Sequence, residues 1–403
     1  MRPLPLEGVR VLDLGQFIAM PFCSQWLAWM GAEVIVIESR RHFTSRGSPP
    51  FAPGHPGDPD ASGYFNLLYG SKKSCTVDMT TEPGRALVRR LAGAVDVMVD
   101  NFSTGVLEKL GLGYDVVRGL NPSIVMASCG AFGRTGPMRH AMGFHSAVNL
   151  FSGVADVTGY PGGAPRILGG VLPDPLGGAY SVFAILAALH HRKRTGQGQF
   201  IDLAMYEAML PLIPEAIIDF TLNGVAPVRI GNRDRVKAPH GIYRCREADT
   251  WVAISVESDE EWRAFCGALG RPEWLADPRF AAGPARRAHV DALDAAVEGW
   301  TRRMTTSEAT EVLQAAGVAA GPVLRSDQLL DDPQLNARGL VVVNDHPRGG
   351  RHRQLGVPWR MDSVGVEYRR APLLGEHTHE ILTKLLGMNE EEYARLEAAG
   401  VLS

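Results

Sequence analysis

Short, almost wholly apolar segments alternate with helical segments over the first 130 residues, and this alternation constrains the fold most. The strand-like segments are residues 9–14, 33–39, 95–102 and 123–130, with a weaker one at 74–79. Helical patterns lie between them, at residues 21–31, which Gly31 closes, and at 82–93. Strands this apolar need cover on both faces. The pattern therefore predicts an α/β fold, a Rossmann-like parallel sheet with helices on either side.

Ligands of such sheets bind beyond the carboxyl ends of the strands. The candidate positions are therefore those that follow each strand: Gly15 to Phe17, Glu38 to Arg40, Asn101 and Phe102, and Gly130 to Gly136. After the first strand the chain reads "LGQFIAMP", so the GxGxxG dinucleotide fingerprint is absent, and no GxxxxGK[ST] loop occurs. The sequence allows a nucleotide-like ligand without indicating a dinucleotide.

A change in composition near residue 222 suggests a second domain. A basic, loop-like stretch is followed by a strand at 251–256 and by helices at 259–270, 290–304 and 306–317. We predict the N-terminal part of a large domain at 1–224, a smaller α+β domain at 225–330, and a C-terminal segment at 331–403. Residues 40–63 form a Pro/Gly/Ser-rich loop that is too long for a simple connector. It is either functional or a plain surface loop.

Composition argues against several classes of protein. The five cysteines are odd in number and lack CxxC spacing, so we expect buried free thiols rather than a zinc site or disulfides. The histidine pairs 190–191 and 377–379 lack acidic or Cys partners at suitable spacing, and no metal is predicted. A net charge of −3 argues against nucleic-acid binding. Without a signal core or an 18-residue apolar run, we expect no membrane association and a cytoplasmic protein.

The stretch "LPDPLGG", residues 172–178, places an acid before a long apolar run. Asp followed by Pro is a common helix N-cap and N1 pair, and on the residues alone capping is the favoured interpretation. A carboxylate at a helix N-terminus is also stabilised as the anion, which is the form that a nucleophile needs. Gly177 and Gly178 leave the backbone bare, either for a substrate or for tight packing.

A series of motifs in order gives the chain a family resemblance. They are "LEGVRVLDL", "WMGAEVIVIE", "KKSCTVDM", "VDNFSTGVLEKLGLGY", "ASCGAFGRTGP", "DPLGGAYSVFAILAALHHRKRTGQGQFIDLAMYEAML" and "RAPLLGEHTHEIL". Together they resemble the class III CoA-transferases, and the resemblance covers almost the whole chain. It implies transfer of CoA from an acyl-CoA to a free carboxylic acid. It also implies that residues 331–403 return to the large domain, and that two chains interlock as a homodimer.

The resemblance also implies site residues. Asp174 matches the family's nucleophile, which forms an anhydride and then a thioester. The glycine-rich segment with Gly177 and Gly178 would supply amides to the oxyanions. The positions that match the family's CoA contacts are Phe17, Ala19, Arg40, Lys72, Lys73, Asn101, Phe102 and Lys109. Lys and Arg at such places suit phosphates.

The chain also departs from the family pattern. Tyr69 and Gly70 stand where the family often has Asn-Arg, and Ile18 replaces a Gln of the formyl/oxalate enzymes, whose multi-glycine run is absent too. We therefore expect an acyl group larger and less polar than formate or oxalate.

Two alternatives remain open. Alpha-methylacyl-CoA racemase, of the same superfamily, pairs a His with the Asp. Its His position is Phe144 here, and His145 comes one residue later, about 100° further around a helix. We therefore expect His145 to be structural, although it could border the pocket. The second alternative is a CoA-binding protein without catalysis.

Overall fold

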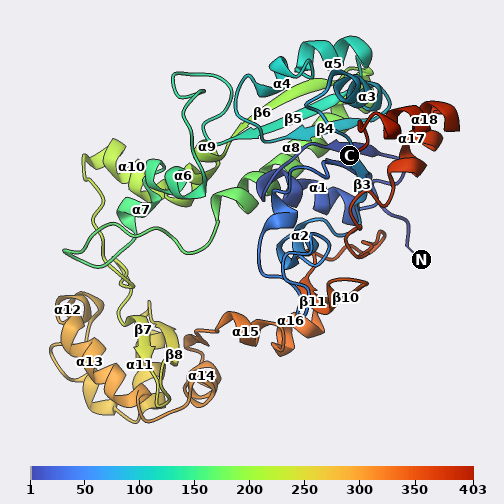
Figure 1. Ribbon diagram of the computed structural model, residues 1–403. Coiled ribbons are helices and arrows are strands. Elements are labelled where there is room, and N and C mark those ends of the chain that lie inside the picture. Colours follow the sequence, from blue (N-terminus) through green and yellow to red (C-terminus); the bar gives the residue numbers. More distant parts are fainter. Residues whose placement is uncertain (1) are drawn as a thin grey trace. The chain divides into compact units, whose positions relative to one another are not determined.

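The computed structural model describes residues 2–403, and these divide into two compact units (Figure 1). Unit 1 contains the residues up to Ala155, Ile167–Ile218 and Pro333–Ser403, and unit 2 contains Asp156–Arg166 and Asp219–Asp332. Each unit has buried apolar clusters of its own. The domain boundaries expected after residues 224 and 330 stay predictions.

Unit 1 is built on the six-stranded parallel sheet that the apolar segments predict. The strand order is β3-β2-β1-β4-β5-β6. The strands are β1 (Arg10–Asp13), β2 (Glu33–Glu38), β3 (Lys73–Thr76), β4 (Val97–Asp100), β5 (Val125–Gly130) and β6 (Gln199–Ala204). This is the strand order of the Rossmann fold, and its direction of winding reverses between β1 and β4.

Helices cover both faces of the sheet. Successive residues of each strand point to opposite sides, and they pack into two different core clusters. Val11, Val99 and Ala127 share one core cluster with α1 (Ala19–Trp29) and α8 (Pro173–Thr195). Leu12, Ile35 and Met98 lie in the other cluster, with α3 (Glu82–Gly93), α5 (Tyr114–Leu120) and α17 (Thr378–Leu386). The predicted two-sided cover is confirmed.

The other short elements belong to unit 1 or lie near the points where the chain passes from one unit to the other. They are α2 (Gly63–Leu68), α4 (Val106–Lys109), α6 (His145–Phe151), α7 (Val154–Val157), α9 (Met205–Met209), α10 (Pro214–Asn223), α15 (Ser326–Leu329), α16 (Pro333–Ala337), the hairpin β10 (Val341–His346) and β11 (Gly350–Leu355), and α18 (Glu390–Ala398). Short 3₁₀ turns occur at Ser45–Gly47 and Leu210–Leu212.

Helix α8 is the longest element and packs tightly on α1. A Cβ added to Gly178 would lie 2.6 Å from the carbonyl oxygen of Ala19, so only glycine permits this approach. The helix ends at Thr195, where Gly196 adopts a left-handed φ of 73°. Glycine adopts this conformation without strain and is typical of helix ends.

Unit 2 is an α+β assembly around an antiparallel sheet. The sheet contains β7 (His240–Arg244), β8 (Trp251–Ser255) and β9 (Ala319–Pro322). Its helices are α11 (Asp259–Leu269), α12 (Gly283–Ala288), α13 (Val290–Thr301) and α14 (Thr306–Ala315), with a 3₁₀ turn at Pro272–Leu275. Thr305 and Glu308 form a capping box at the start of α14, as a Thr followed three residues later by a Glu predicts.

None of the helices within residues 2–403 is long and apolar enough to cross a membrane. The cytoplasmic location expected from the sequence stays a prediction.

Candidate active site

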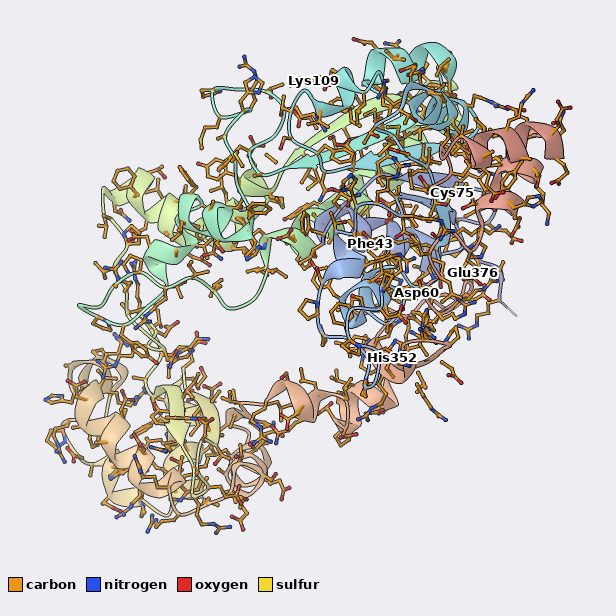
Figure 2. All side chains as sticks on the ribbon, in the orientation of Figure 1. Phe43, Asp60, Cys75, Lys109, His352 and Glu376 are labelled. Atoms are coloured by element: carbon orange, nitrogen blue, oxygen red, sulfur yellow. The ribbon has the colours of Figure 1, made fainter. Side chains whose placement is uncertain are left out.

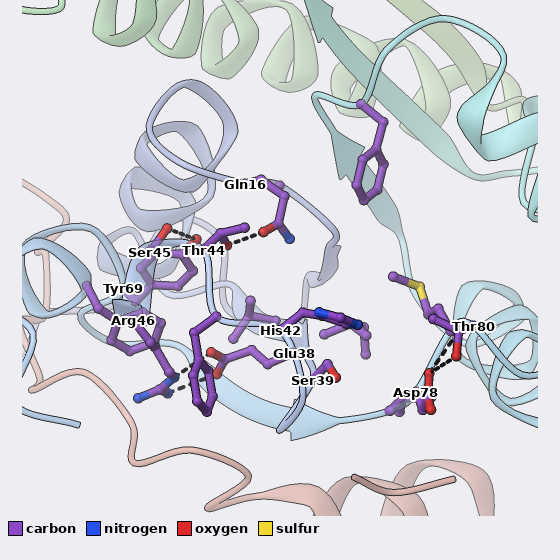
Figure 3. A pocket seen from close by; sticks show the side chains of 18 of the residues that line it. Gln16, Glu38, Ser39, His42, Thr44, Ser45, Arg46, Tyr69, Asp78 and Thr80 are labelled. Carbon is purple, nitrogen blue, oxygen red and sulfur yellow. Dashed lines mark hydrogen bonds and ion pairs between the residues drawn. The ribbon is translucent and has the colours of Figure 1, made fainter. Parts of the chain in front are cut away.

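A cavity of about 300 Å³ lies at the carboxyl ends of β1 to β4 (Figure 3). Residues that follow these strands line it: Gly15 and Gln16, Glu38 and Ser39, Val77 to Thr80, and Phe102. Residues 42–46 of the long loop complete the wall. The cavity therefore sits where open α/β sheets bind their ligands, and this part of the loop is a cavity wall rather than a plain surface loop.

The floor of the cavity is held by buried ion pairs. Arg46 donates to Glu38 at 2.5 Å and to Asp60 at 2.7 Å, and Figure 3 shows the pair with Glu38. The guanidinium carbon lies 3.6 Å from the centre of the Phe65 ring. Glu38 also accepts a hydrogen bond from Ser74. Because the Glu38 carboxylate is already paired with Arg46, it serves the structure and is not free to bind a ligand.

Asn101 fixes the segment that follows β1. Its side-chain oxygen accepts from the backbone N–H of Gln16, and its side-chain nitrogen donates to the carbonyl of Gln16, both at 2.7 Å. Phe17, which follows Gln16, has a φ of 59°, an uncommon value for a residue with a side chain. The Phe17 ring meets the edge of Phe144, with centroids 6.3 Å apart. The structure thus brings Phe17 and Asn101 together beside the start of α6.

Asp174 lies in the first turn of α8 and is not its N-cap. The helix begins at Pro173, Leu172 occupies the cap position, and no side-chain capping bond forms. The favoured capping interpretation is therefore wrong. The Oδ2 atom is buried and has no hydrogen-bond partner among residues 2–403, while His145 Nδ1 lies 3.9 Å away. The Oδ2 atom therefore remains available for chemistry.

The surroundings of Asp174 set its charge. Burial raises the pKa of Asp174 to about 6, against the opposing effect of positive charge on His145. About nine tenths of such a carboxyl is ionised at pH 7. Burial and the charge of Asp174 together raise the pKa of Tyr64 to about 12, so Tyr64 stays a neutral hydroxyl that can donate a hydrogen bond.

Two neighbours of Asp174 were missed in the sequence. Tyr64 belongs to α2, and nothing in its helical context marks it. Cys129, in β5, also responds to Asp174: burial and the carboxylate raise its pKa. Its place at the carboxyl end of a predicted strand was a usable signal. All five cysteines are buried and free, as expected.

Gly177 and Gly178 are both buried, and their missing side chains serve packing. A Cβ on Gly177 would lie 3.0 Å from Met205 Cγ and 3.2 Å from Cys129 Sγ. Gly178 packs on Ala19, itself buried at the start of α1. The packing interpretation thus accounts for both glycines, and their use as oxyanion donors stays a prediction.

The structure corrects the predicted phosphate contacts of two lysines. The ammonium of Lys72 is fully buried and donates to Asp13 at 3.0 Å and to the carbonyl of Pro21 at 2.9 Å. Lys73 pairs with Glu33 at 2.7 Å and with Glu380 at 3.1 Å. Because Glu33 begins β2, the Lys73–Glu33 pair lies at the amino ends of the strands, whereas the cavity lies at their carboxyl ends. Both charges are taken up by structural pairs.

The remaining predicted cations are exposed and adjoin cavity residues in the chain. Arg40 comes shortly after β2, two residues before His42, which lines the cavity. Lys109, labelled in Figure 2, ends α4, and the next residue, Leu110, lines the cavity. Phe102 lines the cavity as well, and its backbone N–H donates to Asp100 at 3.1 Å. Within residues 2–403, no group of three or more His, Cys, Asp or Glu side chains could hold a metal ion.

Fold and site together define a Rossmann-like protein with a buried carboxylate in the first turn of α8 and a cavity at the carboxyl ends of its strands. A family model described as CoA-transferase family III matches residues 6–378, and the chain belongs to that family. It is therefore a class III CoA-transferase, and CoA is part of its substrates.

Relatives along the full chain agree with this assignment. The chain is 36% identical to the succinyl-CoA–D-citramalate CoA-transferase of Chloroflexus aurantiacus, over 99% of this chain and 98% of the relative. It is 33% identical to the succinate–glutarate CoA-transferase of Agrobacterium fabrum, over 95% and 96%. It is 32% identical to a formyl-CoA:oxalate CoA-transferase of Rhodopseudomonas palustris, over 98% and 97%.

Solved structures show the same fold. A CaiB/BaiF family protein from Brucella suis superposes with a TM-score of 0.87 at 32% identity, covering 96% of this chain and 100% of the other. The Rv3272 protein from Mycobacterium tuberculosis gives a TM-score of 0.80 at 31% identity, covering 94% and 99%.

Proposed function

We propose that the protein transfers CoA from an acyl-CoA donor to a free carboxylic acid through covalent intermediates on Asp174. The observation that carries this proposal is the Oδ2 atom of Asp174, which is buried and unpartnered in the first turn of α8. A carboxylate oxygen without a hydrogen bond to give up is a ready nucleophile.

The chemistry balances without an added proton. Asp174 attacks the thioester carbonyl, the C–S bond breaks, and CoA leaves as the thiolate while a mixed anhydride forms. The thiolate attacks the aspartyl carbonyl, which releases the donor acid as a carboxylate. The acceptor carboxylate then attacks the aspartyl thioester and expels the thiolate. That thiolate takes the acceptor acyl group and frees Asp174.

The cavity suits the nucleotide end of CoA. Its volume of about 300 Å³ lies at the lower limit for ligand pockets and fits one end of the cofactor rather than the whole. Arg40 and Lys109 supply positive charge toward the phosphates. The contact between Phe17 and Phe144 connects the cavity wall to the helix that carries His145, so the thioester end would extend toward Asp174.

We propose acids larger and less polar than formate or oxalate as substrates. Ile18, which stands where the formyl/oxalate enzymes have a Gln, offers no polar group to such small anions. Two of the relatives are named for succinate, citramalate or glutarate, so dicarboxylic acids of four to five carbons are the first to test.

Mass spectrometry tests the covalent step. The protein is incubated with succinyl-CoA and other acyl-CoAs, with and without hydroxylamine. We expect an adduct or a hydroxamate on the peptide that contains Asp174, and none in Asp174→Asn. The matched control is Asp115→Asn, because Asp115 is an exposed acid in the first turn of α5. Absence of the adduct in the unchanged protein with every donor, or its persistence in Asp174→Asn, contradicts the proposal.

One observation favours a second candidate function. His145 Nδ1 lies 3.9 Å from Asp174 Oδ2, so a second base stands beside the carboxylate. Such a pair could exchange an α-proton of an acyl-CoA, as in the racemase alternative. Deuterium entering the α-carbon from D₂O without transfer to an acceptor acid would favour that function.

We also propose that the protein acts as a homodimer. The resemblance implies one, and several large apolar side chains of unit 1 are exposed in the single chain: Phe144, Leu150, Phe151, Tyr180 and Phe183. Clusters of this kind mark interaction surfaces in soluble proteins.

A further inference from the structure

Arg134 connects the carboxyl ends of three neighbouring strands. It lies in the glycine-rich turn after β5, and its side chain is nine-tenths buried. The guanidinium donates from Nη2 to Asp100 Oδ1 at 2.5 Å and from Nε to the hydroxyl of Ser128. Its backbone N–H donates to Asp202 Oδ1 at 2.9 Å. Asp100 ends β4, Ser128 is in β5 and Asp202 is in β6.

We propose that Arg134 is a positioning residue for the nucleotide end of CoA, acting through the turn after β4. Asp100 Oδ1 accepts from Arg134 and also from the backbone N–H of Phe102, which lines the cavity. Asn101 lies between them and clamps Gln16 with two hydrogen bonds. Arg134 thereby fixes two walls of the cavity without touching its ligand. The proposal rests on the proposed placement of CoA in this cavity.

Stability alone does not account for a guanidinium here. Its Nη1 atom is buried and has no acceptor among residues 2–403. A buried donor without an acceptor is unfavourable, and a side chain that only paired with Asp100 would not need it. What only Arg supplies is the planar fork that reaches Asp100 and Ser128 at once.

The same strand offers a matched control at its other end. Arg192 of α8 pairs with Asp96, next to the start of β4, at 3.0 Å and also donates to the Asp96 carbonyl at 3.3 Å. Arg192→Met therefore removes a more exposed Arg–Asp pair at the amino end of the strands, away from the cavity. Arg134→Lys keeps the charge but loses the fork.

Calorimetric titration with coenzyme A tests the binding part of the proposal. Loss of a charged hydrogen bond that shapes the site predicts at least about tenfold weaker binding of CoA to Arg134→Met. Arg134→Lys should fall between this variant and the unchanged protein. Arg192→Met should bind within about twofold, because it lies far from the cavity. Equal weakening in the two Arg→Met variants overturns the proposal.

A truncated donor separates positioning from general damage. With succinyl-CoA, Arg134→Met should show a raised KM and an unchanged rate of Asp174 adduct formation at saturation. With succinyl-pantetheine, which has no nucleotide, the variant and the unchanged protein should react alike. A similar loss with both donors shows a merely structural role and overturns the proposal. If the unchanged protein forms no adduct, the covalent mechanism fails, and the CoA titration still decides the role of Arg134.

Discussion

Asp174 meets two opposed requirements at one atom. A nucleophile must be ionised, whereas burial disfavours the charge, and positive charge on His145 and a backbone hydrogen bond offset this only in part. The balance is a pKa raised to about 6, so the reactive form still dominates at neutral pH. Catalysis and stability should therefore respond to this residue in opposite directions.

The rate of adduct formation should fall in acid. Because only the ionised carboxyl attacks, the rate at saturating acyl-CoA should show a midpoint near pH 6 and fall about tenfold per pH unit below it. Burial also raises the pKa of Asp100 to about 6, and saturation keeps its effect on binding out of the measurement. Stopped reactions analysed by mass spectrometry give the profile. A rate that stays flat down to pH 5 would contradict the prediction.

His145 should shift that profile. Positive charge on His145 favours the ionised form of Asp174 and lowers its pKa, so His145→Gln should raise the pKa of Asp174. The acid midpoint of the same rate should move to higher pH. His140→Gln is the control, because His140 is an exposed histidine outside α6. A midpoint that stays in place or moves to lower pH would exclude this electrostatic role.

Asp174→Asn should stabilise the protein above pH 6. The folded-state pKa lies above the ordinary value of 3.8, so stability is lost as pH rises from about 4 to 6, and the full loss applies above 6. A shift of this size corresponds to about 3 kcal/mol, an upper limit for the gain. The thermal midpoint of Asp174→Asn should exceed that of the unchanged protein at pH 8, and the difference should shrink at pH 5. Asp115→Asn should show no such pattern.

At the scale of elements, local signals in the sequence predicted what local physics decides. Apolar runs gave β2 and β5 because buried parallel strands need no polar face, and Gly196 ended α8 because its backbone is left-handed. Contacts between distant residues were out of reach. Nothing in the lysine pair 72–73 shows that Asp13, 59 residues earlier, lies beside Lys72. The start of α8 was misplaced because both Pro173 and Pro175 suit a first helical turn.

The packing of α8 on α1 should depend on Gly178. Alanine there would place a Cβ 2.6 Å from the Ala19 carbonyl, which belongs to a backbone that cannot move freely. We expect Gly178→Ala to lower the thermal midpoint and to slow adduct formation, because the first turn of α8 must shift. Gly119→Ala in α5 meets no atom within 4 Å and should gain up to about 1 kcal/mol from helix propensity. Equal responses of the two variants would contradict this view of the helix pair.

At the scale of the whole molecule, α8 shows a surface that one chain leaves uncovered. The helix buries Gly177, Ser181 and Ile185 in unit 1, yet Phe183 on the same helix is 74% exposed and Tyr180 is 40% exposed. Exposing a large apolar side chain such as Phe183 to water is unfavourable, and such side chains are typical of surfaces that a partner covers. A second copy of the chain is the partner that the family resemblance implies.

Phe183→Glu should therefore weaken self-association. A charge at the centre of an apolar contact must lose its hydration when the surface is covered, at a cost of several kcal/mol. Sedimentation velocity over a range of concentrations should show a dimer for the unchanged protein and a shift toward monomer for Phe183→Glu. Leu120→Glu, at the exposed end of α5, is the control and should remain dimeric. A monomer in the unchanged protein, or equal behaviour of both variants, would assign these apolar side chains to something other than a second copy.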